Sequence, residues 1–434
     1  MSIPINEQTT NNTNPENNIE KELNCGMTEE AKKVTLFQSG VISMPPSKSI
    51  AHRALICAGL SSDKSSIRNL PDSDDINATT RCLRALVEKN NATDATHILD
   101  CGESGTTLRF LIPIAAALGQ SVIFTGHGRL MKRPLDTYFD ILTVHGVKMT
   151  RNKSASGQLF VSGQLTSGLF ELPGHISSQF VSGLLLALPL LSGDSVVQIT
   201  TPLESASYVD LTIDTMQQFG VIIENSGYQK FIIRGGQQYQ SRSLSIEGDY
   251  SQAAFFLVAG ALGCSCSCQG LSNTSKQGDR MILEILKKSS ATLHFDGQDC
   301  YSATAGKLLA QTVDVSDIPD LVPPLAVFLC FCEGESRIIN AGRLRLKESD
   351  RLNAVTTELN KLGAHIIIED DSLLIHGVKS FQGGCVDSHN DHRIAMMAAV
   401  AAIKSTNPVY IEGSNCVTKS YPAFWHDFEK EVRA

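Results

Sequence analysis

The feature that most constrains the fold is an internal repeat with a period of about 70 residues. Six short polar clusters each precede a run of small and apolar residues that is long enough for one helix. Their starts lie 57 to 73 residues apart, and the clusters are Ser47-Lys48-Ser49, Ser104-Gly105-Thr106, Ser177-Ser178-Gln179, Asp249-Tyr250-Ser251, Ile318-Pro319-Asp320 and Asn390-Asp391-His392. Such a period predicts a duplicated α/β architecture, because a single supersecondary unit cannot bury its apolar face alone.

A second helix is expected in each of the first five units. The apolar runs after the clusters show no polar face, which predicts helices buried on most sides. Amphipathic stretches follow them, for example Asp136–Val144, Val209–Phe219, Arg280–Lys288 and Asp350–Leu362. Several stretches end at a glycine (Gly146, Gly220 and Gly363) and run into an alternating segment. Glycine there is typical of a left-handed helix end, and the alternation predicts a strand.

The repeat divides the chain into two halves, with three units before about residue 246 and three after it. We expect a mobile polar leader over 1–32, one domain over 33–45 plus 247–434, and a second domain over 46–246. The segment Thr35–Ser43 is expected to form a strand of the later half, so that the chain crosses twice between the domains. The alternative is a coincidental spacing of common Ser- and Ala-rich helices, which the agreement of five intervals disfavours.

Composition narrows the class of protein. Apolar residues make up 42 % and charged residues 19 % of the 434, which excludes wholesale disorder. The formal charge of −8 argues against a broad nucleic-acid or anionic-membrane surface. No apolar stretch reaches the roughly 20 residues that a membrane helix needs, and residues 1–20 show no secretory signal. Twelve Cys without small-domain spacing fit a reducing cytoplasm, so we expect a cytoplasmic protein.

The polar clusters predict an anion site. Helix N-termini offer free N–H groups and the positive end of the dipole, and several of them could converge on one cleft. Cations lie at or near these positions: Lys48, Arg53, Arg129, Arg351, Arg393 and Lys419. The expected ligand is therefore small and carries several negative charges. For any one of these cations, the alternative is a solvated surface residue.

Two carboxylates lie among these cations. Asp320 and Glu348 each occur at an expected helix start. Different surroundings could make one of them a base and the other an acid. The alternative is simple helix capping by Asp320 and Asp350, and both interpretations stay open at this point.

Other motifs are absent or weak. The sequence contains no Gly-x-Gly-x-x-Gly and no Walker-type loop, so neither a dinucleotide site nor an ATP site is supported. His389-x-x-His392 lacks a convincing third ligand for a metal ion. Cys264-x-Cys266-x-Cys268 more simply places three small residues on one face of a strand. Trp425 is expected to pack in the core or near the terminus.

Taken together and in order, the clusters resemble the EPSP synthase branch of the enolpyruvyl transferase family, over residues 41–428. The resemblance rests on these segments: Pro46–Ala54, Gly102–Arg109, Arg129 five residues before Pro134, Ser177–Phe180, Ser205 with Tyr208, Ile318–Asp320, Lys347–Arg351, Asn390–Arg393 and Lys419. Each segment is a weak signal alone, whereas the ordered set is specific.

The resemblance implies a fold and a reaction. The fold would be α/β, with two domains each built of three βαβαββ units in an inside-out α/β barrel. The activity would transfer the enolpyruvyl group from phosphoenolpyruvate to the 5-hydroxyl of shikimate 3-phosphate in the shikimate pathway of aromatic amino-acid biosynthesis. The reaction would proceed by addition and elimination and release phosphate. It would use no metal and no organic cofactor, and we expect a monomer that binds neither nucleic acid nor membranes.

The resemblance also implies residue roles. Shikimate 3-phosphate would be bound by Lys48, Ser49, Arg53, Ser177, Ser178, Gln179, Ser205, Tyr208, Asp320 and Lys347. Phosphoenolpyruvate would be bound by Lys48, Gly105, Arg129, Gln179, Arg351, Arg393 and Lys419. Asp320 would accept the hydroxyl proton, with Lys48 as the alternative base, and Glu348 would act on the methylene side. Lys48 would also stabilise the departing phosphate.

Two positions depart from the family pattern, namely Glu103 and Arg343, where many or some members have Asn, and no role is carried onto them. The sister enzyme that acts on UDP-N-acetylglucosamine usually has a Cys in the loop around Arg129, and residues 126–132 contain none. A non-catalytic anion-binding protein on the same scaffold is a further alternative, which the intact acids and cations disfavour. Gly105 and Ser177–Phe180 resemble glyphosate-sensitive members, so we expect glyphosate to compete with phosphoenolpyruvate.

Overall fold

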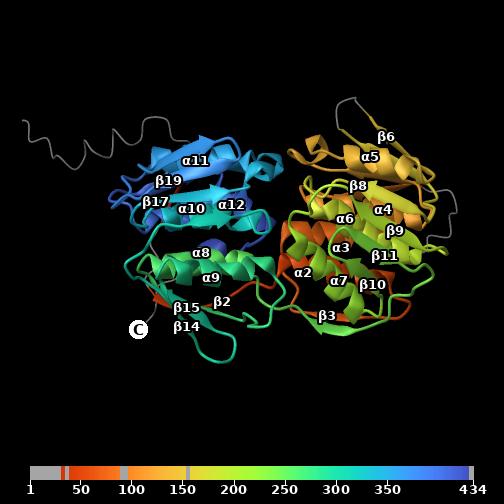
Figure 1. Ribbon diagram of the computed structural model, residues 1–434, viewed down its shortest axis with the longest axis horizontal. Coiled ribbons are helices and arrows are strands. Elements are labelled where there is room, and N and C mark those ends of the chain that lie inside the picture. Colours follow the sequence, from red (N-terminus) through yellow and green to blue (C-terminus); the bar gives the residue numbers. More distant parts are fainter. Residues whose placement is uncertain (1–30, 35–38, 88–95, 153–156, 430–434) are drawn as a thin grey trace, which may run out of the picture.

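The computed structural model describes residues 31–34, 39–87, 96–152 and 157–429. Two globular halves lie side by side, one coloured mainly orange to yellow-green and the other mainly green to blue (Figure 1). Each half combines helices and sheets, so the expected two-domain α/β class is confirmed for this part of the chain. Except for residues 31 and 32, the expected leader lies outside the described residues.

Each of the six apolar runs forms a buried helix. The helices are α2 (Lys48–Leu60), α4 (Gly105–Ala117), α6 (Ser178–Ala187), α8 (Tyr250–Ala261), α10 (Val322–Leu329) and α12 (His392–Ala402). The polar clusters start four of them: side chains of Ser104, Ser177, Asp249 and Asp391 accept hydrogen bonds from backbone N–H groups of the first turn. A short turn, η4 (Pro319–Leu321), precedes α10. The sequence clusters therefore mark helix starts, as predicted.

The second helices also form. They are α3 (Asp74–Val87), α5 (Asp136–Thr143), α7 (Ala206–Gln218), α9 (Ile282–Lys288) and α11 (Arg351–Lys361). The prediction placed the start of α7 three residues too late, and Arg280 belongs to the turn η3 (Gly278–Met281) rather than to α9. Gly146, Gly220 and Gly363 have φ of 88°, 82° and 101°, which confirms the left-handed helix ends.

One pattern of strand pairing recurs in four four-stranded sheets of the described chain. Each sheet joins one parallel pair to an antiparallel hairpin, as a βαβαββ unit requires. In the 46–246 half these sheets are β4 (His97–Asp100), β5 (Val122–Thr125), β7 (Leu159–Gly163) and β6 (Val147–Arg151), and β8 (Leu169–Leu172), β9 (Ser195–Ile199), β11 (Lys230–Ile233) and β10 (Ile223–Ser226). In the other half they are β2 (Ser39–Ser43), β13 (Ser265–Gln269), β15 (Tyr301–Thr304) and β14 (Thr292–Phe295), and β16 (Thr312–Asp314), β17 (Glu335–Ile339), β19 (Ser372–His376) and β18 (His365–Glu369).

The remaining two units are smaller within the described residues. The first pairs β3 (Ser66–Arg68) with β12 (Ser243–Ser245) and has no hairpin of its own, which fits the short first interval of the repeat. The last joins β20 (Gly384–Asp387) and β21 (Val409–Glu412) to β1 (Lys32–Lys33), and a short helix, α13 (Phe424–Phe428), follows them. The repeat is thus confirmed, with complete βαβαββ units in four of its six copies.

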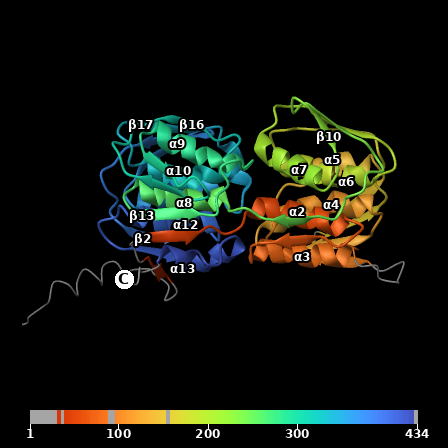
Figure 2. The same ribbon diagram turned by 90° about the horizontal axis from the view of Figure 1, so that it is seen from below.

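The chain passes twice between the halves, and the two passages lie next to each other. β2 pairs in parallel with β13, so the early strand joins the later half, as expected for residues 39–43; residues 35–38 lie outside the described residues (Figure 2). The Ser47 N–H donates to the Glu247 carbonyl at 2.7 Å, and the Asp249 N–H donates to the Pro45 carbonyl at 2.9 Å. Asp249 also accepts from the Lys48 N–H at 3.0 Å, so one carboxylate caps α8 and the start of α2.

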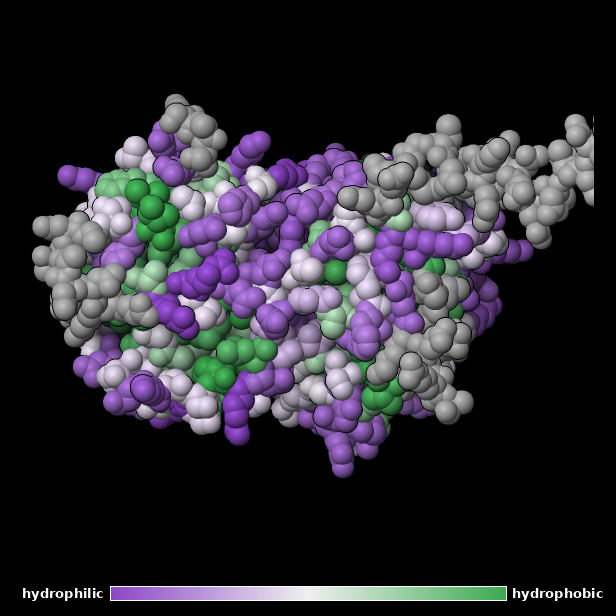
Figure 3. All heavy atoms as spheres, turned by 180° about the vertical axis from the view of Figure 1, so that it is seen from behind, coloured by the Kyte–Doolittle hydropathy of each residue, from purple (hydrophilic) through white to green (hydrophobic). Residues whose placement is uncertain are grey.

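Two large hydrophobic cores correspond to the two halves. One contains Val34, Ile42, Met44 and buried residues between 250 and 428, and the other contains buried residues between 56 and 239. We propose that one domain spans residues 33–45 plus 247–434 and that the other spans residues 46–246. Within the described ranges, no helix has both the length and the apolar character that a membrane crossing needs. Hydrophilic side chains extend across the middle of the molecule, where the halves meet (Figure 3).

Candidate active site

A cleft between the halves collects the helix starts. Its lining includes the first residues of α2, α4, α6, α11 and α12, together with residues of α8 and η4. Helices from both halves therefore direct their free N–H groups toward one space, which favours anions. The predicted residues that line it are Lys48, Ser49, Arg53, Gly105, Ser177, Ser178, Gln179, Ser205, Tyr208, Asp320, Lys347, Glu348, Arg351 and Arg393.

Two predicted phosphoenolpyruvate ligands do not line the cleft in this structure. Arg129 is exposed at the start of the turn η1 (Leu130–Lys132). Lys419 is buried, and its Nζ donates to Glu103 Oε2 and to the Asn390 carbonyl, both at 2.6 Å. Asn390 Nδ2 donates to the same Glu103 carboxylate at 3.2 and 3.3 Å. Glu103, for which the sequence suggested no role, thus links the two halves beside the cleft.

Asp320 is surrounded by cations. Its Oδ1 accepts hydrogen bonds from Lys347 Nζ at 3.2 Å and Arg351 Nη1 at 3.0 Å, and its Oδ2 accepts one from Arg393 Nη2 at 3.1 Å. Burial alone would raise the pKa of this carboxyl, but the three cations outweigh burial and hold the pKa well below its usual range. Capping does not explain Asp320, whereas Asp350 does cap α11 through the Asn353 N–H at 3.2 Å.

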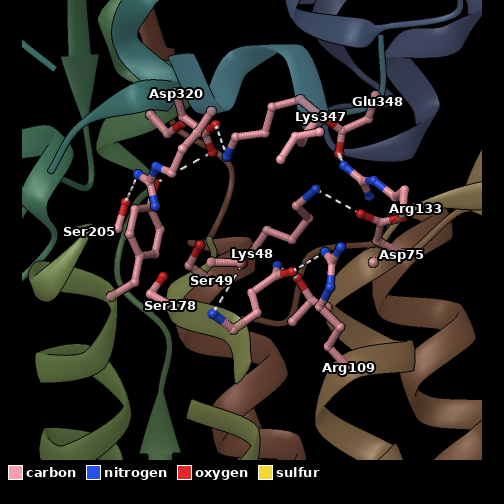
Figure 4. Close-up of a pocket in the computed structure, with 18 of the residues that line it drawn as sticks. Lys48, Ser49, Asp75, Arg109, Arg133, Ser178, Ser205, Asp320, Lys347 and Glu348 are labelled. Atoms are coloured by element: carbon pink, nitrogen blue, oxygen red, sulfur yellow. Dashed lines mark hydrogen bonds and ion pairs between the residues drawn. The ribbon is translucent and has the colours of Figure 1, made fainter. Parts of the chain in front are cut away.

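Glu348 bridges the cleft. Its Oε2 accepts from Arg351 Nη2 at 2.6 Å, and its Oε1 lies 3.2 Å from Nη2 of Arg133, which belongs to the opposite half. Burial opposes ionisation here too, but Arg133 and Arg351 more than compensate and hold the pKa of Glu348 well below its usual range. Glu348 is therefore ionised in the cleft of this structure (Figure 4).

Lys48 lies near the centre of the cleft (Figure 4). Its Nζ donates to Asp75 Oδ2 at 2.8 Å, an acid from α3 that the sequence gave no reason to single out. The Lys48 side chain is 16 % exposed and lines the cleft, so an anion there can reach it. Since Lys48 lies at the start of α2, an anion there meets both a full charge and the helix N-terminus.

The sequence also missed two arginines of the lining, Arg109 and Arg133. Arg109 Nη1 donates to Gln179 Oε1 at 2.7 Å, and burial together with the neighbouring Arg133 lowers the pKa of Arg109 to about 9. A methyl group on Gly105 would lie 2.4 Å from Arg133 Nη1, so the guanidinium packs directly on the start of α4. The signal was present in part, because Arg109 ends the segment Gly102–Arg109 and Arg133 precedes Pro134.

Other predicted residues have structural partners as well. Arg53 donates to Thr212 Oγ1 at 2.7 Å and to the Tyr208 carbonyl at 2.8 Å, which joins α2 to α7, and burial lowers its pKa to about 10. Arg343, left without a role, donates to Ser205 Oγ at 2.5 Å and pairs with Glu204 at 2.6 Å across the halves. It belongs to the lining, so it stands beside the expected shikimate 3-phosphate ligands.

Metal ligation has no support among the described residues, where no three His, Cys, Asp or Glu side chains gather for an ion. His389 instead bonds to the buried Glu358 at 2.8 Å. Cys266 and Cys268 share the buried face of β13, as expected, whereas Cys264 precedes the strand and is half-buried. Burial lowers the pKa of His392, another member of the lining, to about 3, so this imidazole is neutral.

The arrangement suits a reaction between two anions. Lys48, Arg53, Arg109, Arg133, Arg343, Lys347, Arg351 and Arg393 all line one cleft, although the whole chain is acidic. Two carboxylates, Asp320 and Glu348, stand among them at different places. The cleft can therefore neutralise two multiply charged ligands and still offer groups for proton transfer.

Comparison with known proteins adds a family. The family model described as EPSP synthase (3-phosphoshikimate 1-carboxyvinyltransferase) matches residues 35–428. A protein of that name from Clostridium kluyveri is 49 % identical over 402 residues, which cover 90 % of this chain and 94 % of the relative. Another, from Clostridium novyi, is 46 % identical over 424 residues, which cover 93 % and 97 %.

Solved structures agree on the fold. An EPSP synthase from Acinetobacter baumannii superimposes with a TM-score of 0.73 at 24 % identity, covering 90 % of this chain and 96 % of that one. The enolpyruvyl transferase NikO from Streptomyces tendae gives a TM-score of 0.72 at 16 % identity, with coverage of 92 % and 96 %. These two likenesses concern the fold alone.

Proposed function

This chain belongs to the EPSP synthase (3-phosphoshikimate 1-carboxyvinyltransferase) family, and from that premise we propose how its cleft works. The enzyme transfers the enolpyruvyl group of phosphoenolpyruvate to the 5-hydroxyl of shikimate 3-phosphate and releases phosphate, a step of the shikimate pathway. The observation that carries the residue roles is the pair of carboxylates, Asp320 and Glu348, held by cations in one cleft.

We assign two neighbouring substrate subsites. Shikimate 3-phosphate binds among Lys48, Ser49, Arg53, Ser177, Ser178, Gln179, Ser205, Tyr208, Asp320 and Lys347, which come from both halves. Phosphoenolpyruvate binds among Lys48, Gly105, Gln179, Arg351 and Arg393, with Arg129 and Lys419 joining from the rim. All of these residues except Arg129 and Lys419 line the cleft, which supports the assignment. Arg109 and Arg133 add positive charge beside Gly105 and belong to the second subsite.

The addition step needs one base and one acid. The 5-hydroxyl oxygen bonds to C2 of phosphoenolpyruvate, its proton passes to Asp320, and the methylene carbon takes a proton from Glu348. Elimination then breaks the bond between C2 and the phosphate oxygen, while Glu348 takes a proton back from the new methyl group. Lys48 stabilises the departing phosphate as a full charge at a helix start.

Glu348 must carry a proton before it can act as the acid. In the structure Arg133 and Arg351 keep it ionised. A bound phosphoenolpyruvate brings its own negative charges to these guanidiniums and adds like charge beside Glu348. Both effects raise the pKa of the carboxyl, so substrate binding itself prepares the acid.

We further propose a monomer that acts in the cytoplasm on small anions and needs no metal or organic cofactor. The acidic net charge and the gathering of eight cations in one cleft support small ligands over nucleic acid. Light scattering coupled to size exclusion should give the mass of one chain, and a dimer mass would contradict this assignment.

The function is tested by phosphate release with each substrate alone and with both. We expect release above background only when phosphoenolpyruvate and shikimate 3-phosphate are both present, with one enolpyruvyl ether formed per phosphate, measured by mass spectrometry. Release from phosphoenolpyruvate alone would indicate hydrolysis, and no release with both would contradict the assignment.

A further inference from the structure

Asp279 is a buried carboxyl group that the reaction as described does not use. It lies in the turn η3, and the whole residue is 4 % exposed. Its Oδ2 accepts a hydrogen bond from Tyr208 Oη at 3.1 Å, while Oδ1 has no hydrogen-bond partner among the described residues. Buried carboxylates are normally paired or fully hydrogen-bonded, so this group needs an explanation.

The same tyrosine hydroxyl also reaches the active site. Tyr208 Oη lies 3.1 Å from Asp279 Oδ2 and 3.4 Å from Asp320 Oδ2. The hydroxyl has one proton and two lone pairs, so it can donate to one carboxylate while it accepts a hydrogen bond from the other carboxyl group once that group is protonated. Tyr208 belongs to α7 of one half, whereas both carboxylates belong to the other half, so this chain of three groups exists only when the halves meet.

Resting on the proposed function, we propose that Asp279 is the final acceptor of the 5-hydroxyl proton, which reaches it from Asp320 through Tyr208. The O–H bond of the substrate breaks and an O–H bond forms on Asp320. Asp320 then gives its proton to Tyr208 Oη as Tyr208 gives its own proton to Asp279. Asp320 returns to the carboxylate form, Tyr208 is unchanged, and Asp279 loses its proton to solvent after product release.

The relay addresses a weakness of Asp320 as a base. Its three cations hold its pKa well below the usual range, and a carboxylate of low pKa keeps a proton poorly. Burial and the nearby charge of Asp320 raise the pKa of Asp279 to about 7, so a proton is more stable there.

The surroundings of Asp279 agree with this direction. The charged groups that face it are Asp320 on η4, Asp249 at the start of α8 and Arg393 on α12, besides the neutral Tyr208 on α7. The charges of the two carboxylates outweigh that of the one guanidinium, so they add to the effect of burial and raise the pKa of Asp279. Asp249 is a weaker candidate for the acceptor, because it already accepts backbone N–H bonds from Lys48, Ser251 and Gln252.

The decisive variants are Asp279→Asn and Tyr208→Phe, studied by single-turnover rapid quench between pH 5.5 and 8.5. In the unchanged enzyme, the rate should rise with pH through about 7 as Asp279 becomes able to accept a proton. Asp279→Asn should lower the rate at pH 8 at least about tenfold and abolish that rise, while shikimate 3-phosphate affinity by calorimetry stays within about threefold. Tyr208→Phe should abolish the same rise, and the double variant should be no slower than the slower single variant.

Matched controls come from a second tyrosine–aspartate pair, in which Asp210 belongs to α7 and Tyr228 to the turn between β10 and β11. Tyr228 Oη donates to Asp210 Oδ2 at 2.8 Å, and neither residue lines the cleft. Asp210→Asn and Tyr228→Phe should keep both the rate and its dependence on pH. A change of the same size in these controls would mean that the loss of any such bond disturbs the enzyme, and it would overturn the proposal.

Stability separates a relay from a merely structural role. A carboxyl whose pKa is raised by folding costs stability as pH rises through about 7, so Asp279→Asn should melt at the same or a higher temperature than the unchanged enzyme at pH 8. A lower melting temperature with lost substrate affinity, or an unchanged rate and pH profile in Asp279→Asn, would overturn the relay. Failure of the proposed function itself would look different, because the unchanged enzyme would then release no phosphate.

Discussion

At the scale of single residues, the proposed chemistry uses two carboxylates that cations keep ionised in this structure. Asp320 contacts Lys347, Arg351 and Arg393, and Glu348 contacts Arg133 and Arg351. Such buried pairs add little net stability, because desolvation offsets attraction. Removing one partner is nevertheless costly, since it leaves buried charge without compensation. The residues are therefore placed for reactivity rather than for stability.

Lys48→Met tests the central cation. Methionine keeps the length of the stem and removes the charge, so turnover should fall at least about a hundredfold, the scale of losing one electrostatic donor. The measurement is kcat from coupled phosphate release. Lys64→Met is the control, because Lys64 is exposed just beyond the end of α2 and should tolerate the change. Turnover within threefold of the unchanged enzyme in Lys48→Met would refute the assignment.

Asp320→Asn and Glu348→Gln test the proton-transfer groups. The amides can still form hydrogen bonds but cannot accept a proton, so turnover should fall at least about a hundredfold. Shikimate 3-phosphate should still bind within about tenfold. Glu348→Gln should also slow exchange of the methylene protons of phosphoenolpyruvate into deuterated solvent, followed by NMR. Full turnover in both variants would place proton transfer on other groups.

Acid stability gives an independent check on Asp320. A carboxyl whose pKa is lowered by folding contributes stability above its unfolded pKa of about 4 and loses it as pH falls through the folded value. Asp320→Asn should therefore unfold more easily at pH 7, by on the order of 2 kcal/mol in urea. This difference from the unchanged enzyme should shrink progressively below about pH 4. A difference that is constant down to pH 2.5 would show that ionisation of Asp320 does not matter for stability.

At the scale of elements, we propose that the starts of the buried helices bind the substrates. The starts of α4, α6 and α12 bring free N–H groups to the cleft, and each of these helices is begun by a cap that is local in sequence. α4 is the clearest case, because its first residue, Gly105, packs against Arg133 and Arg109. The absence of a side chain there leaves space for the guanidiniums and for a ligand.

Gly105→Ala tests this use of space. The added methyl group would lie 2.4 Å from Arg133 Nη1 and 3.3 Å from Arg109 Nη1, so the guanidiniums must shift toward the cleft. We expect KM for phosphoenolpyruvate to rise about tenfold or less and inhibition by glyphosate, the longer molecule, to weaken more. Gly193→Ala is the control, because its methyl group would meet only the end of the Ser167 side chain, 2.4 Å away and outside the cleft lining. Equal losses for both ligands in Gly105→Ala would contradict the steric argument.

At the scale of the whole molecule, contacts across the cleft set how the halves sit. Arg343 pairs with Glu204, and Glu103 pairs with Lys419. Since shikimate 3-phosphate is expected to contact both halves, its binding should favour the arrangement in which they meet. Such closure would also exclude water from the reaction.

Glu103→Gln tests the connection between the halves. Loss of the carboxylate should weaken the pair with Lys419 by about 1 kcal/mol and shift the balance toward more open forms about fivefold. Small-angle scattering should then give a larger radius of gyration than for the unchanged enzyme, and shikimate 3-phosphate should restore the compact value. Glu333→Gln is the control, because Glu333 pairs with Lys307 on the surface of one half. Identical scattering for Glu103→Gln and the unchanged enzyme would show that this pair does not hold the halves.

Much of the fold could be predicted from sequence because its signals are local. Apolar runs, caps and end glycines act over three or four residues, so the starts of α4, α6, α8 and α12 followed from the clusters. Part of the cleft lining followed too, because residues such as Gly105 and Ser178 are helix starts, whereas Ser205 and Tyr208 followed only from the resemblance to the family. The predicted starts of α7 and α9 were wrong. Neither helix has a side-chain cap at its start, and Ser205, the residue before α7, has a φ of 55°.

The sequence by itself determined the repeat, the helix starts and the set of charges that the helix starts carry. Only the tertiary structure decided which charges meet, because those contacts join residues far apart in the chain: Lys419 and Glu103 are separated by 316 positions, and Tyr208 and Asp320 by 112. Whether such pairs form depends on how two cores pack and how their halves meet, which no local pattern encodes. Asp75, Arg133 and Asp279 entered the site for that reason alone: packing of distant elements placed their side chains beside groups that the sequence had already marked.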